Sequence, residues 1–207
     1  MDKTSKLFDV WANTGRSEEM EKGHGTTVNQ FLNKLSLKEN FRFLDIGCGN
    51  GWVVRKMSQK SSCIKAIGID KSKMMIKNAK SKILSNKESF FATELEFWNT
   101  KEKFDVIFSM ESLYYSVPME PALEKVFKLL KKGGTFYCGT DFYSDNTLTT
   151  RWIKDMDIPM DLRSEKEWKQ MFRDIGFTTR SKHVTDSKNK SKWKRELGTL
   201  FVIGRKP

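Results

Sequence analysis

The 207-residue sequence has few of the residues that build disulfide frameworks and metal centres. It contains three cysteines, Cys48, Cys63 and Cys138, and two histidines, His24 and His183. An odd, scattered set of cysteines argues against disulfides and against a zinc site. Two histidines are too few for a histidine-rich metal centre. We therefore expect no bound metal and a reduced, cytoplasmic setting.

Long apolar runs are also lacking. No segment approaches the length that a membrane-spanning helix needs, and residues 1–6 lack the apolar segment of a signal peptide. The chain length instead fits one α/β domain with its own core. Fifteen phenylalanines and six tryptophans supply bulky side chains for that core.

Negative charge is the scarcer sign, because 38 Lys and Arg residues face 26 Asp and Glu residues and the formal charge is +12. A basic chain invites an RNA-binding hypothesis. The lysines, however, are spread through 56–87 and 182–194 rather than gathered in one stripe. The basic link 188–195 contains one tryptophan and has the composition to contact phosphate and stack a base. Such links are more often solvated hairpin loops, and we favour that interpretation.

The most informative stretch joins a short apolar segment, 41–46, to three glycines at alternate positions, Gly47, Gly49 and Gly51. The apolar spacing of a helix begins at Trp52. A strand that turns sharply into a helix presents free backbone N–H groups to a ligand. Glycine is needed there because a side chain would block the ligand or the turn.

The glycine spacing also argues against a dinucleotide site. That fold uses G-x-G-x-x-G, whereas here the third glycine position is Trp52. An uncharged nucleoside or an amino-acid tail fits better than a pyrophosphate. Asp45 precedes the turn and is able to bind an ammonium group or shape the loop. Asp70 ends a second apolar segment at the separation typical of a ribose-binding acid.

Residues 45–51, Asp-Ile-Gly-Cys-Gly-Asn-Gly, together with Gly68-Ile69-Asp70, resemble motifs I and II of the class I S-adenosylmethionine-dependent methyltransferases. The resemblance implies a Rossmann-like three-layer α/β/α sandwich. Its sheet would have seven mostly parallel strands, with the last strand antiparallel. It also implies a methyltransferase that uses S-adenosylmethionine and releases S-adenosylhomocysteine.

Within this fold the hydrophobic pattern predicts strands near 41–46, 64–69, 89–92, 104–109, 135–140, 177–184 and 197–203. It predicts helices within 4–34, where Ser17 is the expected N-cap of a short helix, and near 51–59, 72–84, 120–130 and 165–175. Ser164 and Glu167 form a capping box for the last helix, and Lys131–Gly134 is expected to stop the preceding one. We divide the single domain, 1–207, into a helical cap (1–40), a cofactor-binding core (41–140), a substrate-lid insertion (141–163) and C-terminal elements (164–207).

The resemblance carries a set of cofactor-binding residues onto this sequence. The family usually has an acidic residue for the adenine amino group near 93–97, but this chain has no aspartate there and has Glu96 in place of a proline. Thr93 and Glu94 are the candidates instead. The full predicted set is Asp45, Gly47, Cys48, Gly49, Asn50, Gly51, Asp70, Lys71, Thr93, Glu94, Ser109 and Met110.

The methyl acceptor is expected beside the N-terminal helices and the segment after the fourth strand. Candidates for a general base are His24, Glu111 and Tyr115. Candidates for contact with the acceptor are Arg16, Glu19, Tyr114 and Tyr143. Simple alternatives stay open, because 11–25 also reads as a solvated loop and tyrosines often serve only in packing.

Three functions follow from these predictions. The leading one is methyl transfer to a small molecule, because the covers at 1–40 and 141–163 suggest an enclosed pocket. The alternative is an RNA or protein methyltransferase, which the charge of +12 favours. The second alternative is a regulatory module that binds S-adenosylmethionine without turnover. The sequence does not specify the oligomeric state.

Overall fold

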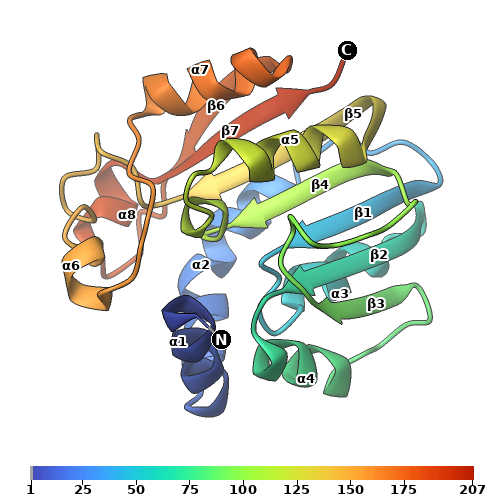
Figure 1. Cartoon of the computed structure of the whole chain (residues 1–207), viewed down its shortest axis with the longest axis horizontal. Coiled ribbons are helices and arrows are strands. Elements are labelled where there is room, and N and C mark those ends of the chain that lie inside the picture. The colour runs from blue at the N-terminus through green and yellow to red at the C-terminus, as the bar shows by residue number, and fades with distance from the viewer. Residues whose placement is uncertain (1) are drawn as a thin grey trace.

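The structure is a computed structural model that describes residues 2–207, so Met1, the first residue of the predicted cap, lies outside it. Seven strands form one sheet in the order β3-β2-β1-β4-β5-β7-β6 (Figure 1). Strands β1 to β5 are parallel, and β7 runs antiparallel to both β5 and β6. Their bounds are β1 Phe41–Ile46, β2 Cys63–Asp70, β3 Glu88–Ala92, β4 Phe104–Met110, β5 Leu130–Thr140, β6 Thr178–Val184 and β7 Thr199–Arg205.

Helices cover both faces of this sheet because its strands are apolar on both sides. Successive residues of a strand point to opposite faces, so Phe43 and Leu44 of β1 enter different core clusters. One cluster gathers side chains of α2, α3 and α4, and the other gathers those of α5 and α7. These helices are α2 Arg16–Leu32, α3 Trp52–Ser58, α4 Lys73–Ser81, α5 Glu120–Leu129 and α7 Glu165–Ile175. The predicted three-layer Rossmann-like fold is confirmed.

The N-terminal segment is more regular than its glycines suggested. Helix α1, Lys3–Asn13, is joined to α2 by Gly15, which adopts φ +78°. The expected N-cap at Ser17 is wrong, because Gly15 occupies that position and α2 continues through 23–25. Helix α1 is held against α4, since Asp9 Oδ1 accepts a hydrogen bond of 2.5 Å from Ser72 Oγ. Both helices therefore form an ordered cover rather than a solvated loop.

Two boundaries differ from the sequence-based expectation. Residues 131–134 do not stop a helix but lie inside β5, which begins at Leu130 beside Phe104 of β4. The Lys131 ammonium is bound 2.9 Å from the Asp105 carboxylate of β4, a partner that helix-stop rules do not consider. The link 188–195 contains a short helix, α8 Lys192–Glu196, instead of a plain hairpin loop.

Two other predicted segments have the expected character. Segment 141–163 is irregular apart from the short helix α6, Trp152–Met156. The capping box of Ser164 and Glu167 is confirmed at the start of α7, and Gly176 ends that helix with φ +108°. No helix among residues 2–207 combines the length and apolar content needed to cross a membrane.

Candidate functional site

A cavity of about 640 Å³ lies at the carboxyl ends of β1, β2 and β4. Its walls come from the glycine turn after β1, from Asp70, from the segment after β4, and from α1 and α2. Ligands of open α/β sheets bind at this edge. The volume falls within the range typical of small-molecule sites.

The turn between β1 and α3 has a backbone that only glycine adopts without strain. Gly47 has φ +68°, and the N–H groups of Gly47 and Cys48 both donate to the Ile69 carbonyl, at 2.9 and 3.0 Å. A Cβ at Gly47 would lie 1.9 Å from Ser112 Oγ, whereas a Cβ at Gly49 would meet open space. Gly49 also lines the cavity, so the backbone there is open to a ligand.

Two carboxylates face this turn. Asp70 accepts hydrogen bonds from the N–H groups of Gly49, at 2.9 Å, and Ser72, at 2.8 Å. Burial raises the pKa of Asp70, although those two bonds oppose it. Burial and then the Asp70 charge raise the pKa of Asp45 well above its usual range. Among residues 2–207, none donates a hydrogen bond to Asp45.

A cationic ligand beside Asp45 would lower that pKa by charge attraction. S-adenosylmethionine carries an ammonium and a sulfonium, and its nucleoside has ribose hydroxyls for a strand-end carboxylate. The cavity size, the open turn and the unpartnered Asp45 therefore fit this cofactor.

Most of the other predicted cofactor residues also line the cavity, namely Cys48, Asn50, Lys71, Thr93, Glu94 and Met110. Asn50 donates to Glu21 of α2 at 2.8 Å. Gly51 and Ser109 are not among the lining residues. Gly51 instead allows close packing, because a Cβ there would lie 2.6 Å from the Phe90 ring. Ser109 is fully buried within β4.

Glu111, directly after β4, has a buried carboxyl group with a strongly raised pKa at the acceptor end of the cavity. Its φ of +52° is uncommon for a residue other than glycine, and Glu111 lines the cavity. One oxygen accepts from the Asp141 N–H and the other from Tyr114 OH, the latter at 2.9 Å. Burial and the nearby Asp141 charge raise the pKa of Glu111 to about 8. Tyr115 lines the cavity, and burial raises its pKa above the ordinary phenol value.

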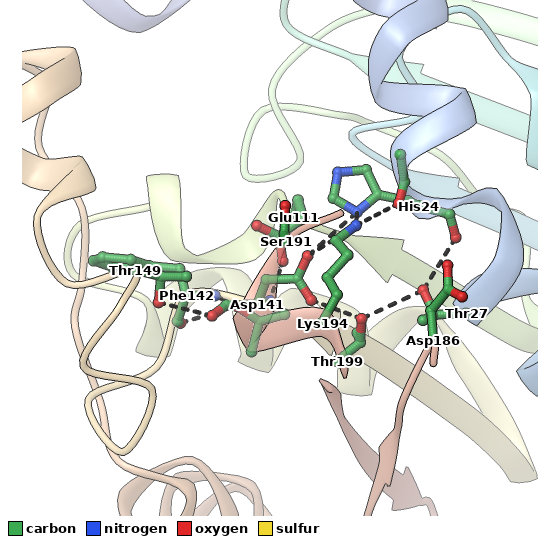
Figure 2. Close-up of polar contacts among 12 residues, drawn as sticks. His24, Thr27, Glu111, Asp141, Phe142, Thr149, Asp186, Ser191, Lys194 and Thr199 are labelled. Carbon is green, nitrogen blue, oxygen red and sulfur yellow. Dashed lines mark hydrogen bonds and ion pairs between the residues drawn. The ribbon is translucent and has the colours of Figure 1, made fainter. Parts of the chain in front are cut away.

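His24 of α2 lines the same cavity and contacts two charged residues that the sequence-based reasoning missed (Figure 2). Its Nδ1 lies 3.4 Å from Asp141 Oδ2 and 3.1 Å from Lys194 Nζ. Burial opposes ionisation of Asp141, but contacts from His24, Lys194 and Thr199 outweigh it and hold the Asp141 pKa below its usual value. A signal for Asp141 existed, because it follows β5 as Glu111 follows β4. Lys194 gave no separate signal because it lies in the basic link 188–195.

Several predicted acceptor residues lie away from the cavity. Arg16 pairs with Glu19 on the surface at 2.8 Å and stacks over the Trp11 ring. Tyr114 is buried behind Glu111, and Tyr143 is buried with its hydroxyl 3.4 Å from the Gly198 carbonyl. Within residues 2–207 no cluster of three or more metal-binding side chains is found, and all three cysteines are buried and free.

Three similar proteins carry methyltransferase names. The first is the methyltransferase in the solved complex with the Haloferax volcanii Trm112 methyltransferase activator. It is 26% identical, with a TM-score of 0.89 and 97% of each chain covered. The second is malonyl-[acyl-carrier protein] O-methyltransferase of Priestia megaterium, which is 24% identical over 66% of this chain and 47% of that enzyme. The third is the N-methyltransferase NodS of Bradyrhizobium japonicum, solved with S-adenosylhomocysteine. It is 21% identical, with a TM-score of 0.67, 90% of this chain covered and 87% of NodS.

The chain spans about half the length of the relatives first matched by sequence. The family model described as "Methyltransferase domain" matches residues 18–182, which is most of the chain and includes the glycine turn, Asp70, Glu111 and Asp141. The chain therefore belongs to the methyltransferase domain family, within its class I, S-adenosylmethionine-dependent group.

Proposed function

We propose that this chain transfers a methyl group from S-adenosylmethionine to a small-molecule acceptor. The observation that carries the proposal is that one cavity joins the glycine turn and the unpartnered Asp45 to His24, Glu111 and Tyr115. Donor and acceptor would thus share one cavity. Holding two reactants in line accounts for up to about 7–11 kcal/mol of a reaction barrier.

The cofactor's sulfonium, when bound, supplies a methyl group that is already activated by positive charge. In our proposal the backbone at 47–51 approaches its methionine part, and Asp45 binds its ammonium. Asp70 accepts the ribose hydroxyls, because each of its oxygens has a second lone pair beyond its backbone bond. Thr93 and Glu94, both in the cavity wall, stay the candidates for the adenine amino group.

Glu111 is our choice among the three candidate bases. Its pKa of about 8 means that it holds a proton at neutral pH in the free protein. A cation in the cavity favours the ionised form, which is then able to accept a proton from a methyl acceptor. Tyr115 is a poorer base because burial makes its phenol harder to ionise.

The cover that α1 and α2 form over the site favours a small molecule over RNA. Helices α1 and α2 contribute Phe8, Ser17, Met20 and His24 to the cavity wall, and Pro159 of the proposed lid 141–163 adds to it. The charge of +12 keeps RNA as the second candidate. A steep fall of RNA affinity with rising salt would favour that alternative.

A protein partner is a further proposal, prompted by the activator in the Haloferax complex. Strand β3 is at the edge of the sheet and has an open side. Exposed apolar side chains lie in β3 or in its flanking segments, namely Ile83, Leu84, Phe91 and Phe97. Such edges invite strand addition. Co-expression with an activator of this type, followed by size-exclusion chromatography, tests the idea. Separate elution would refute it.

The cofactor assignment is tested by calorimetric titration of S-adenosylmethionine into the wild type and Asp70→Ala. Loss of hydrogen bonds to a charged group should weaken binding about 10- to 100-fold. Asp155→Ala on the exposed helix α6 is the matched control and should bind as the wild type does. Unchanged affinity in Asp70→Ala, with the fold intact, would remove the ribose assignment.

Turnover is tested separately with methyl-labelled cofactor and a cell extract. Label in the metabolite fraction supports the proposal, whereas label in RNA or protein selects the alternative acceptors. Cofactor binding without any labelled product would indicate the regulatory module.

A further inference from the structure

Helix α8 places a lysine ammonium inside the protein. Lys194 is only 4% exposed. Its Nζ donates to the Gly23 carbonyl of α2, lies 3.1 Å from His24 Nδ1 and is 3.5 Å from Asp141 Oδ2 (Figure 2). An ammonium has three N–H donors and no acceptor. Each of these three contacts therefore calls for an acceptor atom opposite the Lys194 ammonium, and His24 Nδ1 is one of the three atoms.

The ammonium decides which His24 nitrogen carries the proton. In a neutral imidazole one nitrogen donates and the other accepts. A proton on Nδ1 would point at the Lys194 N–H groups, so the 3.1 Å contact requires that Nδ1 offer its lone pair. The remaining acceptor for an Nδ1 proton is Asp141 Oδ2. It lies farther away, at 3.4 Å, and makes no hydrogen bond with any residue in the described part of the chain.

Asp141 is held by other groups. Its second carboxylate oxygen accepts a bond of 2.6 Å from Thr199 Oγ1, and its backbone N–H donates to Glu111. Its role toward His24 is thus to balance the charge of Lys194 rather than to receive the imidazole proton.

We propose that Lys194 is a positioning residue that holds His24 in the tautomer with its proton on Nε2. Because Nδ1 faces Lys194 and His24 lines the cavity, the opposite ring nitrogen is the one available to a ligand (Figure 2). His24 thus presents an N–H donor to the cavity. In the methyl transfer proposed above, on which this consequence rests, His24 binds an oxygen of the acceptor molecule and Glu111 takes the proton.

This role also explains one residue of the basic link 188–195. Lys194 is directed inward, so it is not available to phosphate. The neighbouring Trp193 packs edge-on against Trp152 of α6, with ring centroids 5.7 Å apart. Helix α8 thereby connects the proposed lid to His24.

The tautomer is measured directly by two-bond ¹H–¹⁵N correlation spectra of uniformly ¹⁵N-labelled protein. The chain has only two histidines, and His183→Asn assigns both signals. The spectra are recorded about two pH units above the ordinary imidazole pKa, where a free ring is neutral. We expect His24 to show the Nε2–H pattern. An Nδ1–H pattern for His24 would overturn the proposal.

The role of Lys194 is tested with Lys194→Met, an unbranched side chain one atom shorter that has neither the charge nor an N–H donor. His24 should then change to the Nδ1–H tautomer and donate to Asp141. Lys192→Met, an exposed position on the same helix, is the control and should leave the spectrum unchanged. Persistence of Nε2–H in Lys194→Met would refute the positioning role. If this variant fails to fold, Lys194→Leu, which likewise has no N–H donor, replaces it under the same criterion. These spectra need no acceptor and no turnover, so they are independent of the proposed activity.

Discussion

The two ends of the cavity are built in different ways. The cofactor end is made by six consecutive residues, 45–50, and by the end of the neighbouring strand β2. The acceptor end combines α2, the residue after β4, the residue after β5 and α8. Local backbone geometry therefore determines the first, whereas the second exists only once distant segments have packed together. Substitutions at the acceptor end should therefore lower the unfolding free energy more than substitutions at the cofactor end.

The largest effect should come from the long-range end. Asp141→Ala leaves the Lys194 ammonium buried without its carboxylate, and breaking a buried ion pair typically costs about 3–5 kcal/mol of unfolding free energy. Denaturant unfolding measures this loss. The exposed pair of Lys3 and Asp157, 2.9 Å apart, provides the control, since Lys3→Ala should cost less than about 1 kcal/mol. Equal losses in the two variants would mean that the buried network adds nothing.

At the local end, Gly47→Ala should destabilise the protein by about 2–4 kcal/mol. The added Cβ combines left-handed strain with overlap against Ser112. Gly49→Ala carries the left-handed strain without the overlap and should cost about 1–2 kcal/mol. Unfolding curves separate the two. If Gly47→Ala were no worse than Gly49→Ala, close approach to Ser112 would not be the reason for glycine at this position.

This contrast also explains what the sequence revealed. The glycine turn, the seven strands and the capping box at Ser164 depend on neighbours in the chain or on regular apolar spacing, so they were predictable. The N-cap of α2 was misassigned because Gly15 and Ser17 both suit helix starts, and Gly15 holds the position with φ +78° and no side-chain cap bond. The start of β5 was missed because Lys131 is bound by Asp105, which is 26 residues earlier.

The acceptor end was predictable only in part. His24, Glu111 and Tyr115 were identified as polar residues near strand ends or in the cap, and they do share the cavity. Tyr143 follows the same strand end as Asp141 but is directed into the core. No spacing rule separates these two, because the difference arises from contacts with α8 and β7. Lys194 likewise resembles its solvated neighbours until α8 folds against α2.

A pH series is the next test of the acceptor end. The pKa of Glu111 is raised to about 8 in the folded protein and returns to its ordinary value on unfolding. The folded state therefore binds one more proton between those values. Its stabilising contribution is complete below the ordinary carboxyl pKa and is lost as the pH rises through about 8, with a slope of at most about 1.4 kcal/mol per pH unit.

Glu111→Gln should flatten this fall, because the amide has no proton to lose. Asp45 and Asp70, whose pKa values are also raised, will leave a residual slope. Glu39→Gln, at an exposed position, should reproduce the wild-type profile. Unfolding free energies measured from about pH 5 to 8 provide the comparison. A Glu111→Gln profile parallel to the wild type would show that Glu111 ionises normally.

The smallest effect concerns a polar contact that joins Asn50 of the cofactor turn to Glu21 of α2. Asn50 Nδ2 donates to Glu21 Oε2 at 2.8 Å, and Asn50 is buried. A double-mutant cycle of Asn50→Ala and Glu21→Ala should give a coupling of about 1 kcal/mol in unfolding free energy. The same cycle on the exposed pair of Arg16 and Glu19 should give a coupling of only about 0.2–0.5 kcal/mol. A coupling at Asn50 no larger than this control would mean that the two ends of the cavity are stabilised independently, and that α2 covers the cofactor turn without supporting it.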